Sequence, residues 1–215
     1  MCKVAVVLSG CGVYDGAEIN ETVLTLLSLE ENGIQYQCFA PDIEQYHVIN
    51  HLTGEETNGK RNVLQEASRI VRGNCKPLKE LNAADFDGLL VPGGFGVAKN
   101  LSNVAFEGSA FTVNNEFLTV CLAFKELKKP AGYMCIAPAL LGKIYESIHC
   151  TIGNDPNTAT IIEKNGGTHH DTAVNEVIID ETNRVVTTSC YMLAENINQA
   201  RSGIIKLVEA LKRMF

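Results

Sequence analysis

Short apolar runs alternate along the chain with segments of helical periodicity. Residues 3–9 and 87–91 are apolar without alternation, which is typical of strands buried on both faces of a sheet. Further strands are expected at residues 34–40, 131–134, 177–180 and 184–188, the last two as a hairpin. Because helical segments separate most of these strands, the pattern predicts a mostly parallel sheet with helices on both faces.

Apolar residues three or four apart define the helices. The first is expected to begin near Ala17 and to end at Gly33. Its apolar face carries Ile19, Val23, Leu26 and Leu27. Further helices are expected at residues 61–71, 114–127, 136–145, 158–165 and 191–213. Residues 42–58 are polar and irregular and are expected to form a surface excursion. No repeat or low-complexity linker divides the chain, so we predict one flavodoxin-like, doubly wound α/β domain over residues 1–215.

The charge and cysteine content of the chain limit which binding partners and which cellular compartment we expect. The net charge of -7 opposes binding to nucleic acid or to an anionic membrane surface. The first apolar run is too short for a signal peptide, and no run approaches the roughly 18 apolar residues of a membrane helix. Among the eight cysteines, four lie in apolar runs, as free thiols do: Cys2, Cys38, Cys121 and Cys190. These features predict a cytoplasmic protein with reduced thiols.

Cys135 is the strongest candidate for chemistry. It stands where the buried strand at residues 131–134 passes directly into the helix at residues 136–145. This turn resembles the nucleophile elbow of α/β-hydrolases, with cysteine in place of serine. The helix N-terminus is expected to stabilise a thiolate and to lower the pKa of Cys135. The alternative is that Cys135 is one more buried core thiol.

Two other turns follow strands at the same edge of the predicted sheet. The run Pro-Gly-Gly-Phe-Gly at residues 92–96 includes Gly93 and Gly94, whose backbone N–H groups no side chain obstructs. The N–H groups of Gly94 and Ile136 are the natural pair for an oxyanion hole.

The other turn, at residues 10–16, delivers two carboxylates to the same region. Glu18 and Glu21 lie three residues apart at the start of a helix, so they share a face. Acidic residues in a first turn also stabilise the helix dipole, which is the simpler explanation for either residue alone. Tyr191 and Met192 follow the last strand, and are expected either to line the site or to pack at a helix start.

Several motifs resemble those of a known superfamily. Three runs are similar to the PfpI superfamily of the class I glutamine amidotransferase-like fold: Gly-Ala-Glu-Ile-Asn-Glu-Thr (16–22), Val-Pro-Gly-Gly-Phe-Gly-Val-Ala-Lys-Asn-Leu-Ser (91–102) and Gly-Tyr-Met-Cys-Ile-Ala-Pro-Ala (132–139). Others resemble the ElbB glyoxalase-like family: Cys-Gly-Val-Tyr-Asp-Gly-Ala-Glu-Ile (11–19), Cys-Phe-Ala-Pro-Asp (38–42), Val-Ile-Asn-His-Leu-Thr-Gly-Glu (48–55) and Thr-Ile-Gly-Asn-Asp (151–155). The resemblance spans nearly the whole chain. It implies a Cys135 nucleophile, Glu21 against the thiol with Glu18 beside it, and a homodimer.

The chain departs from the amidotransferases and proteases of this superfamily in its histidines. Ile136 follows Cys135 directly, where some relatives carry a histidine, and Asp155 occupies the position of another. The histidines in this part of the chain are His149, His169 and His170. None matches the pattern, so a full Cys-His triad, and with it glutamine hydrolysis or proteolysis, is not expected.

The resemblance implies a glutathione-independent glyoxalase that needs no cofactor or metal. Its substrates would be small dicarbonyls such as glyoxal and methylglyoxal, which add to Cys135 as a hemithioacetal and leave as 2-hydroxy acids. Glu21 would move the proton between the two carbons, and the N–H groups of Gly94 and Ile136 would hold the oxyanion. The alternative is a redox or stress sensor, or an accessory protein of the same fold, because a reactive thiol is also oxidised by peroxide.

Two other functions have weaker support. The glycines at positions 10, 12 and 16 follow the first strand, but their spacing is not that of a dinucleotide fingerprint. His47 and His51 have helical spacing without the glutamate of a zinc-protease motif, and no Cys-x-x-Cys pair is present. Neither nucleotide nor metal binding is therefore predicted.

Overall fold

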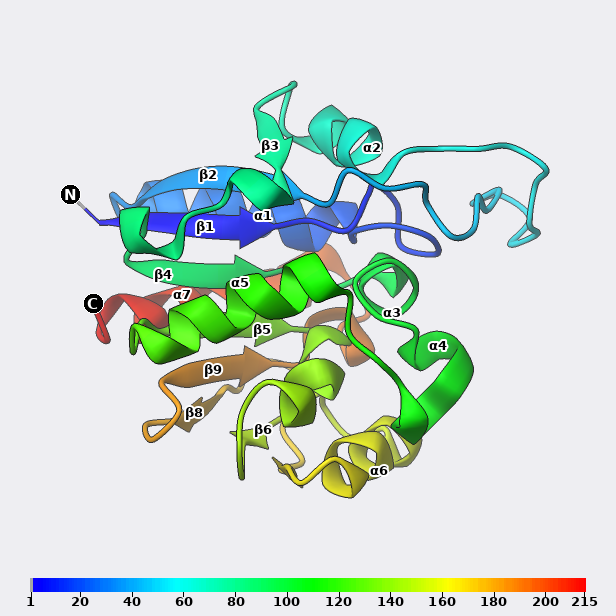
Figure 1. The fold of residues 1–215 in the computed structure, drawn as a ribbon. Coiled ribbons are helices and arrows are strands. Elements are labelled where there is room, and N and C mark those ends of the chain that lie inside the picture. Colours follow the sequence, from blue (N-terminus) through cyan, green and yellow to red (C-terminus); the bar gives the residue numbers. More distant parts are fainter. Residues whose placement is uncertain (1) are drawn as a thin grey trace.

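The computed structural model describes residues 2–215, so Met1 lies outside the described part of the chain. Its centre is a seven-stranded sheet in the order β3-β2-β1-β4-β5-β9-β8 (Figure 1). The strands are β1 (Lys3–Val7), β2 (Gln35–Ala40), β3 (Cys75–Pro77), β4 (Gly88–Val91), β5 (Ala131–Met134), β8 (Ile178–Asp180) and β9 (Val185–Thr188). All neighbouring pairs are parallel except the β8–β9 hairpin. The predicted flavodoxin-like, doubly wound α/β class is confirmed.

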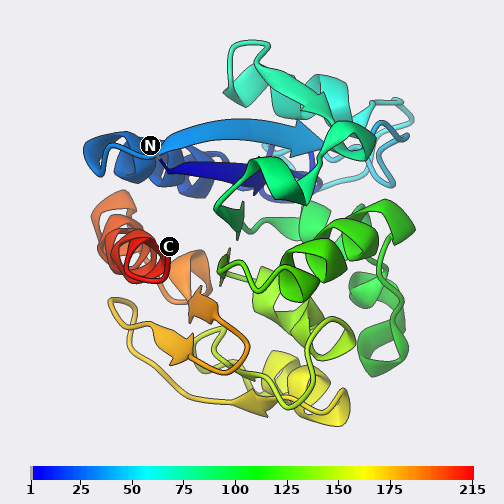
Figure 2. The same ribbon diagram turned by 60° about the vertical axis from the view of Figure 1, so that its left-hand side comes forward.

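Helices cover both faces of this sheet. They are α1 (Ile19–Glu31), α2 (Val63–Ile70), α3 (Phe95–Lys99), α4 (Val104–Glu107), α5 (Asn115–Glu126), α6 (Pro156–Lys164) and α7 (Ile197–Lys212). In Figures 1 and 2, α5 lies on one face of the sheet and the packed pair α1 and α7 on the other. Side chains alternate between the faces along a strand, so Leu89 of β4 joins the core beneath α5 and Leu90 the core beneath α7.

The strand at the nucleophile was predicted with its observed bounds, and most other elements to within a few residues. The helical segment after Cys135 is a 3-10 helix over Ala137–Lys143 rather than an α-helix. The last helix begins at Ile197 rather than near residue 191, because Asn196 caps it and the preceding Cys190–Met192 forms a separate 3-10 turn. No bounds were predicted from the sequence for five short elements: β3, α3, α4 and the paired strands β6 (His149–Cys150) and β7 (Thr168–His169).

The apolar face predicted for α1 is not the face that the structure buries. Ile19, Val23 and Leu27 are 43%, 48% and 41% exposed. The buried residues of this helix are Glu21, Thr22, Leu24, Thr25, Ser28 and Leu29. The buried face is largely polar because it borders the candidate site, where Thr22 and Glu21 bond to polar groups of the turn before the helix and of neighbouring strands.

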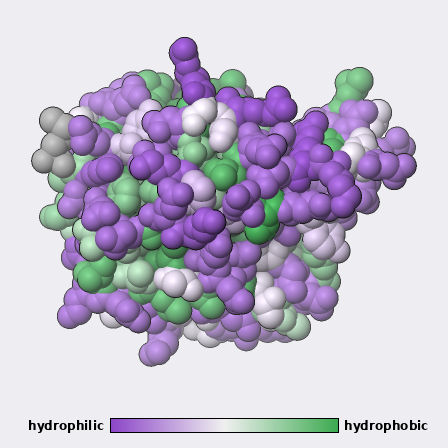
Figure 3. Space-filling model, turned by 45° about the horizontal axis from the view of Figure 1, so that its top comes forward, coloured by the Kyte–Doolittle hydropathy of each residue, from purple (hydrophilic) through white to green (hydrophobic). Residues whose placement is uncertain are grey.

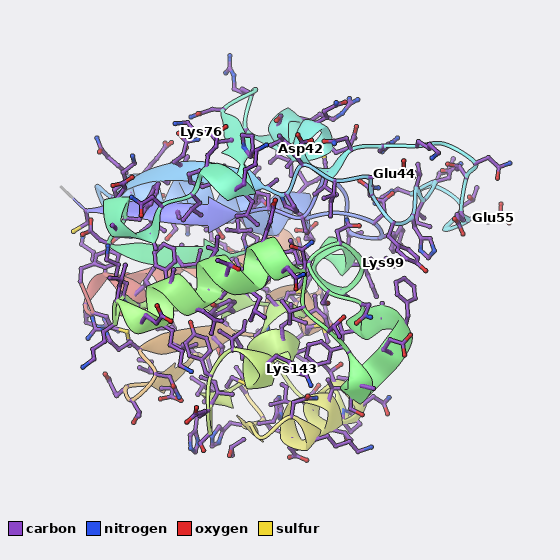
Figure 4. The ribbon with its side chains drawn as sticks, in the orientation of Figure 1. Asp42, Glu44, Glu55, Lys76, Lys99 and Lys143 are labelled. Atoms are coloured by element: carbon purple, nitrogen blue, oxygen red, sulfur yellow. The ribbon has the colours of Figure 1, made fainter. Side chains whose placement is uncertain are left out.

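The polar segment between β2 and α2 forms the predicted excursion. It extends away from the body in Figure 1, and Asp42, Glu44 and Glu55 mark its course in Figure 4. Its base is anchored, because Gln45 N–H donates to the Arg61 carbonyl at 2.8 Å. The face shown in Figure 3 is mostly hydrophilic with scattered hydrophobic groups. No helix within residues 2–215 has the length and apolar character needed to cross a membrane.

Candidate active site

The cysteine elbow forms at the carboxyl end of β5. Cys135 has a φ of 59°, a conformation that costs a residue other than glycine about 1–3 kcal/mol. Its N–H donates to the Thr188 carbonyl at 3.0 Å, which ties the elbow to the end of the neighbouring strand β9. Cys135 is only 7% exposed, so its side chain is largely enclosed by the protein. Such a strained, over-determined conformation is common at reactive residues.

The glycine turn after β4 packs directly against this elbow. A Cβ at Gly93 would lie 2.7 Å from the Cys135 sulfur and 2.6 Å from Glu21 Oε2, so no side chain fits there. Gly94 has a φ of 97°, and a Cβ on it would overlap the backbone of Gly16 and Glu18. The N–H groups of Gly94 and Ile136 both lie near the Cys135 sulfur and act to lower the pKa of its thiol. The two expected oxyanion donors therefore converge at the thiol.

Strand order brings the first turn to the same place. In the sheet, β1 lies between β2 and β4, so the chain adds β2 and β3 on one side of β1 and β4 and β5 on the other. Ligand sites commonly form where the strand order reverses in this way, beyond the carboxyl ends of the strands. The turn after β1 is bonded to the turn after β4, through Glu18 N–H to the Gly93 carbonyl at 2.9 Å and Gly96 N–H to the Gly16 carbonyl at 2.8 Å. These bonds place the start of α1 beside Cys135.

Glu18 caps α1 rather than facing the thiol. Its side chain accepts from the Glu21 N–H at 2.6 Å, which is the N-cap interaction typical of an acidic residue at a helix start. Burial raises the pKa of Glu18, and hydrogen bonds from backbone N–H groups oppose that shift. The geometry of Glu18 therefore supports the simpler explanation, that this acidic residue stabilises the start of the helix.

Glu21 is fully buried against Cys135. Its Oε2 accepts from Gly93 N–H at 2.8 Å, its Oε1 from Tyr191 N–H at 3.1 Å, and the carboxylate also meets the Cys135 thiol. Burial raises the pKa of Glu21 to about 7, with the Glu18 charge adding to the shift and the hydrogen-bond donors opposing it. At neutral pH this carboxyl group can therefore both accept and return a proton.

The expectation of a lowered cysteine pKa is wrong. Burial and the nearby Glu21 carboxylate raise the pKa of the Cys135 thiol, against the effect of the Gly94 and Ile136 N–H groups. The 3-10 helix after the elbow also supplies a weaker dipole than a long α-helix would. A neutral Cys135 thiol therefore lies beside a Glu21 carboxyl group that is partly ionised at neutral pH and able to accept a proton.

One residue of the site, Cys190, was not assigned to it from the sequence, and for a second, Tyr191, the sequence left a choice between lining the site and packing at a helix start. Cys190, expected to be a core thiol, is fully buried with a φ of 42° in the turn after β9. Burial raises its pKa, and the negative charges of Glu21 and Glu18 add to the shift. Tyr191 contributes its N–H to Glu21, and its phenol accepts a hydrogen bond from Asn20 at 3.2 Å. Their position after a strand parallel to β5 was the available signal.

The candidate histidines lie elsewhere. His149 Nδ1 and His170 Nε2 are 2.9 Å apart in a stacked pair, and His169 accepts from Ile152 N–H. Asp155, the position where some relatives carry a histidine, caps α6 through Thr158. Within residues 2–215, no histidine bonds to Cys135 or Glu21, and no three His, Cys, Asp or Glu side chains are grouped to hold a metal ion.

The sheet order and the cysteine elbow define an α/β protein of the amidotransferase-like type. No family model matches the chain. The ES1 protein homolog, mitochondrial, of Rattus norvegicus is 41% identical over 217 residues, which cover 96% of this chain and 82% of the relative. The human glutamine amidotransferase-like class 1 domain-containing protein 3, mitochondrial, is 41% identical over 96% of this chain and 81% of its own length. The chain therefore belongs to the family of glutamine amidotransferase-like class 1 domain proteins, together with the ES1 proteins.

Solved structures agree with this assignment. An isoprenoid biosynthesis protein with amidotransferase-like domain from Ehrlichia chaffeensis is 36% identical, with a TM-score of 0.93 over 100% of this chain and 99% of that chain. Glyoxalase III from Candida albicans shares the fold, with a TM-score of 0.62 over 97% of both chains, at 13% identity.

The names of the curated relatives correct the prediction of a cytoplasmic protein. The rat, human and zebrafish (Danio rerio) proteins are each described as mitochondrial. Free thiols and a negative net charge indicate a reducing compartment, but they do not distinguish the cytoplasm from other reducing compartments. The prediction of a cytoplasmic protein was therefore wrong.

Proposed function

We propose that this chain is a cofactor-free, glyoxalase-like enzyme of the ElbB type that converts small 2-oxoaldehydes such as glyoxal and methylglyoxal to 2-hydroxy acids. The observation that carries the proposal is the Cys135–Glu21 pair, a thiol and a carboxyl group with a pKa of about 7 in one buried site. A cysteine paired with a carboxyl group instead of a histidine suits proton movement between adjacent carbons better than amide hydrolysis.

The first step is addition of the Cys135 sulfur to the aldehyde carbon. Glu21 takes the thiol proton as the sulfur–carbon bond forms and passes it to the aldehyde oxygen, which becomes the hemithioacetal hydroxyl group and leaves Glu21 free to act as a base again. The N–H groups of Gly94 and Ile136, which lie near the sulfur, donate to that oxygen as it gains charge.

The second step moves a proton from the former aldehyde carbon to the neighbouring carbonyl carbon. Glu21 removes it and returns it through an enediol, which leaves a thioester on Cys135 and a hydroxyl group on the next carbon. Water then cleaves the thioester, releasing the 2-hydroxy acid and the free thiol, so the net reaction adds one water. A carboxyl pKa near the working pH serves both directions of this transfer.

The test is the rate of dicarbonyl loss by reduced protein without glutathione, compared among variants. Cys135→Ala and Glu21→Gln are expected to lose turnover, whereas Cys38→Ala, which removes a buried thiol of β2 outside the site, retains it. Full turnover in Cys135→Ala or in Glu21→Gln would overturn the proposal, and so would a wild type that leaves both dicarbonyls unchanged.

Glu18→Gln separates the two glutamates. The amide oxygen still caps α1, but the negative charge that raises the Glu21 pKa is gone. The variant is therefore expected to remain active, with the midpoint of its pH–rate profile moved to lower pH. Loss of activity in Glu18→Gln with retention in Glu21→Gln would assign the proton transfer to Glu18 instead.

A further inference from the structure

Two cysteines follow neighbouring strands at the edge of the sheet that carries the site. Met134 of β5 and Thr188 of β9 are register partners, so Cys135 and Cys190 lie in turns that begin side by side. Cys135 N–H bonds to the Thr188 carbonyl at 3.0 Å, which holds these turns together. Neighbouring strands lie about 4.8 Å apart, and disulfide-bonded cysteines have Cα atoms about 4.4–6.8 Å apart.

Both backbones turn in the same unusual way. Cys135 has a φ of 59° and Cys190 a φ of 42°, in the left-handed region that favours glycine. Both side chains pack into the core cluster between the sheet and the α1–α7 pair, and Cys190 has no exposed surface. The second thiol is therefore enclosed with the nucleophile rather than exposed to outside partners.

Glu21 links the two turns. One carboxylate oxygen accepts from the N–H of Tyr191, the residue directly after Cys190, and the other accepts from Gly93 beside Cys135. Burial and the Glu21 charge raise the pKa of Cys190. One buried carboxyl group thus meets the Cys135 thiol and also bonds to the backbone of the turn that holds Cys190.

We propose that Cys190 is a resolving thiol that captures peroxide-oxidised Cys135 as an intramolecular disulfide. In the first step, the Cys135 sulfur attacks a peroxide oxygen, the O–O bond breaks, and the sulfenic acid forms. Glu21 takes the thiol proton and passes it to the leaving hydroxide or alkoxide, which departs as water or an alcohol. The sulfur is oxidised by two electrons and the peroxide is reduced by two.

In the second step, the Cys190 sulfur attacks the sulfenic sulfur. The S–O bond breaks, the S–S bond forms, and the Cys190 proton leaves with the hydroxyl group as water. A small thiol reductant reverses the product by thiol–disulfide exchange. The disulfide stops Cys135 before the irreversible sulfinic acid, and it blocks the nucleophile while it lasts. This chemistry uses the proposed nucleophile but does not depend on dicarbonyl turnover.

Mass spectrometry of protein treated with hydrogen peroxide tests the proposal. The reduced wild type is expected to lose two hydrogens and to yield a peptide pair joined through Cys135 and Cys190, which dithiothreitol separates. Cys190→Ala is expected to lose that pair and to accumulate sulfinic acid at Cys135. Cys150→Ala removes a buried thiol of β6 outside the site and should keep the pair.

Cys190→Ser provides a second variant if the alanine protein is unstable, and circular dichroism establishes that each variant is folded. Equal sulfinic acid at Cys135 in the wild type and in a folded Cys190 variant, with no linked peptide pair in the wild type, would overturn the proposal. Formation of the pair in a protein that leaves dicarbonyls unchanged would support the resolving thiol while removing the glyoxalase function.

Discussion

At the scale of single residues, the site depends on the absence of a side chain as much as on its reactive groups. Gly93 lies where any Cβ would meet the Cys135 sulfur and the Glu21 carboxylate together. The same residue donates its N–H to Glu21 and accepts from Glu18 N–H through its carbonyl. One glycine therefore sets the spacing between the nucleophile and its base.

Gly93→Ala is predicted to abolish activity at Cys135 and to lower the free energy of unfolding by about 2 kcal/mol, in the range of other overpacked cores. Iodoacetamide labelling of Cys135 and urea unfolding measure the two effects. Gly59→Ala is the matched control, because its Cβ would meet only ordinary contacts at 3.5 and 3.6 Å. An alanine at position 93 that leaves both measurements unchanged would contradict the described contact.

The raised pKa of Glu21 predicts a pH dependence of stability. Between the ordinary carboxyl pKa and about 7, the folded state holds a proton on Glu21 that the unfolded state has lost. Stability from this group is therefore present at low pH and is lost as the pH rises towards 7, by up to about 3 kcal/mol. Urea unfolding at about pH 5 and about pH 8 measures this loss.

Glu21→Gln isolates that contribution, because it removes the titrating group and keeps the size of the side chain. As the pH rises, the wild type should lose unfolding free energy relative to the Glu21→Gln variant. A difference that stays constant across this range, or moves the other way, would show that Glu21 has an ordinary pKa.

At the scale of elements, buried parallel strands were the most predictable part of the fold. β1, β4 and β5 are continuous apolar runs, and that pattern reflects burial on both faces. The same strands predicted that the three loops after them meet at one edge of the sheet. The candidate site residues could therefore be assigned to one site from the sequence: Cys135, Glu21, Glu18, Gly93, Gly94 and Ile136. Short elements such as β3 and α3 carry too few residues to show a period.

Other features depend on tertiary contacts that no local pattern records. The apolar stripe of α1 has helical spacing whether it faces a core or solvent, and only the packing against α7 and the site decides which face is buried. The direction of the Cys135 pKa shift likewise depends on full burial and on the Glu21 charge. The position of Cys190 could have been inferred from strand order, but its apolar neighbours favoured a core role.

Helix caps give a prediction at this scale. The Asn196 side chain accepts from Gln199 N–H at 3.0 Å and begins α7, which packs along α1 behind the site. Asn196→Ala is expected to cost about 1 kcal/mol of unfolding free energy, the usual value of an N-cap. Asn58→Ala, on the exposed excursion, is the control and should cost much less. Equal stability of both variants in urea would contradict the capping role.

At the scale of the whole molecule, the exposed apolar stripe of α1 bears on assembly. Ile19, Val23 and Leu27 lie on successive turns, each more than two-fifths exposed, close to the site residues Glu18 and Glu21. The family resemblance implies a homodimer, and we propose that this stripe is buried in it. A charge at the stripe would then be placed in an apolar interface.

The proposed homodimer is predicted to become a monomer in the Val23→Glu variant, as measured by size-exclusion chromatography with light scattering. Leu52→Glu, at a position 94% exposed on the excursion, is the control and should leave the dimer intact. A monomeric wild type, or a Val23→Glu protein as dimeric as the wild type, would contradict this assignment.

The measurement that tests the central claim most directly is the identity of the product. Reduced, anaerobic wild-type protein is incubated with methylglyoxal without glutathione or added metal, and carbon NMR follows the substrate. The account predicts conversion to lactate by the wild type and none by Cys135→Ala. Unchanged methylglyoxal with the wild type, or equal lactate formation with Cys135→Ala, would contradict it.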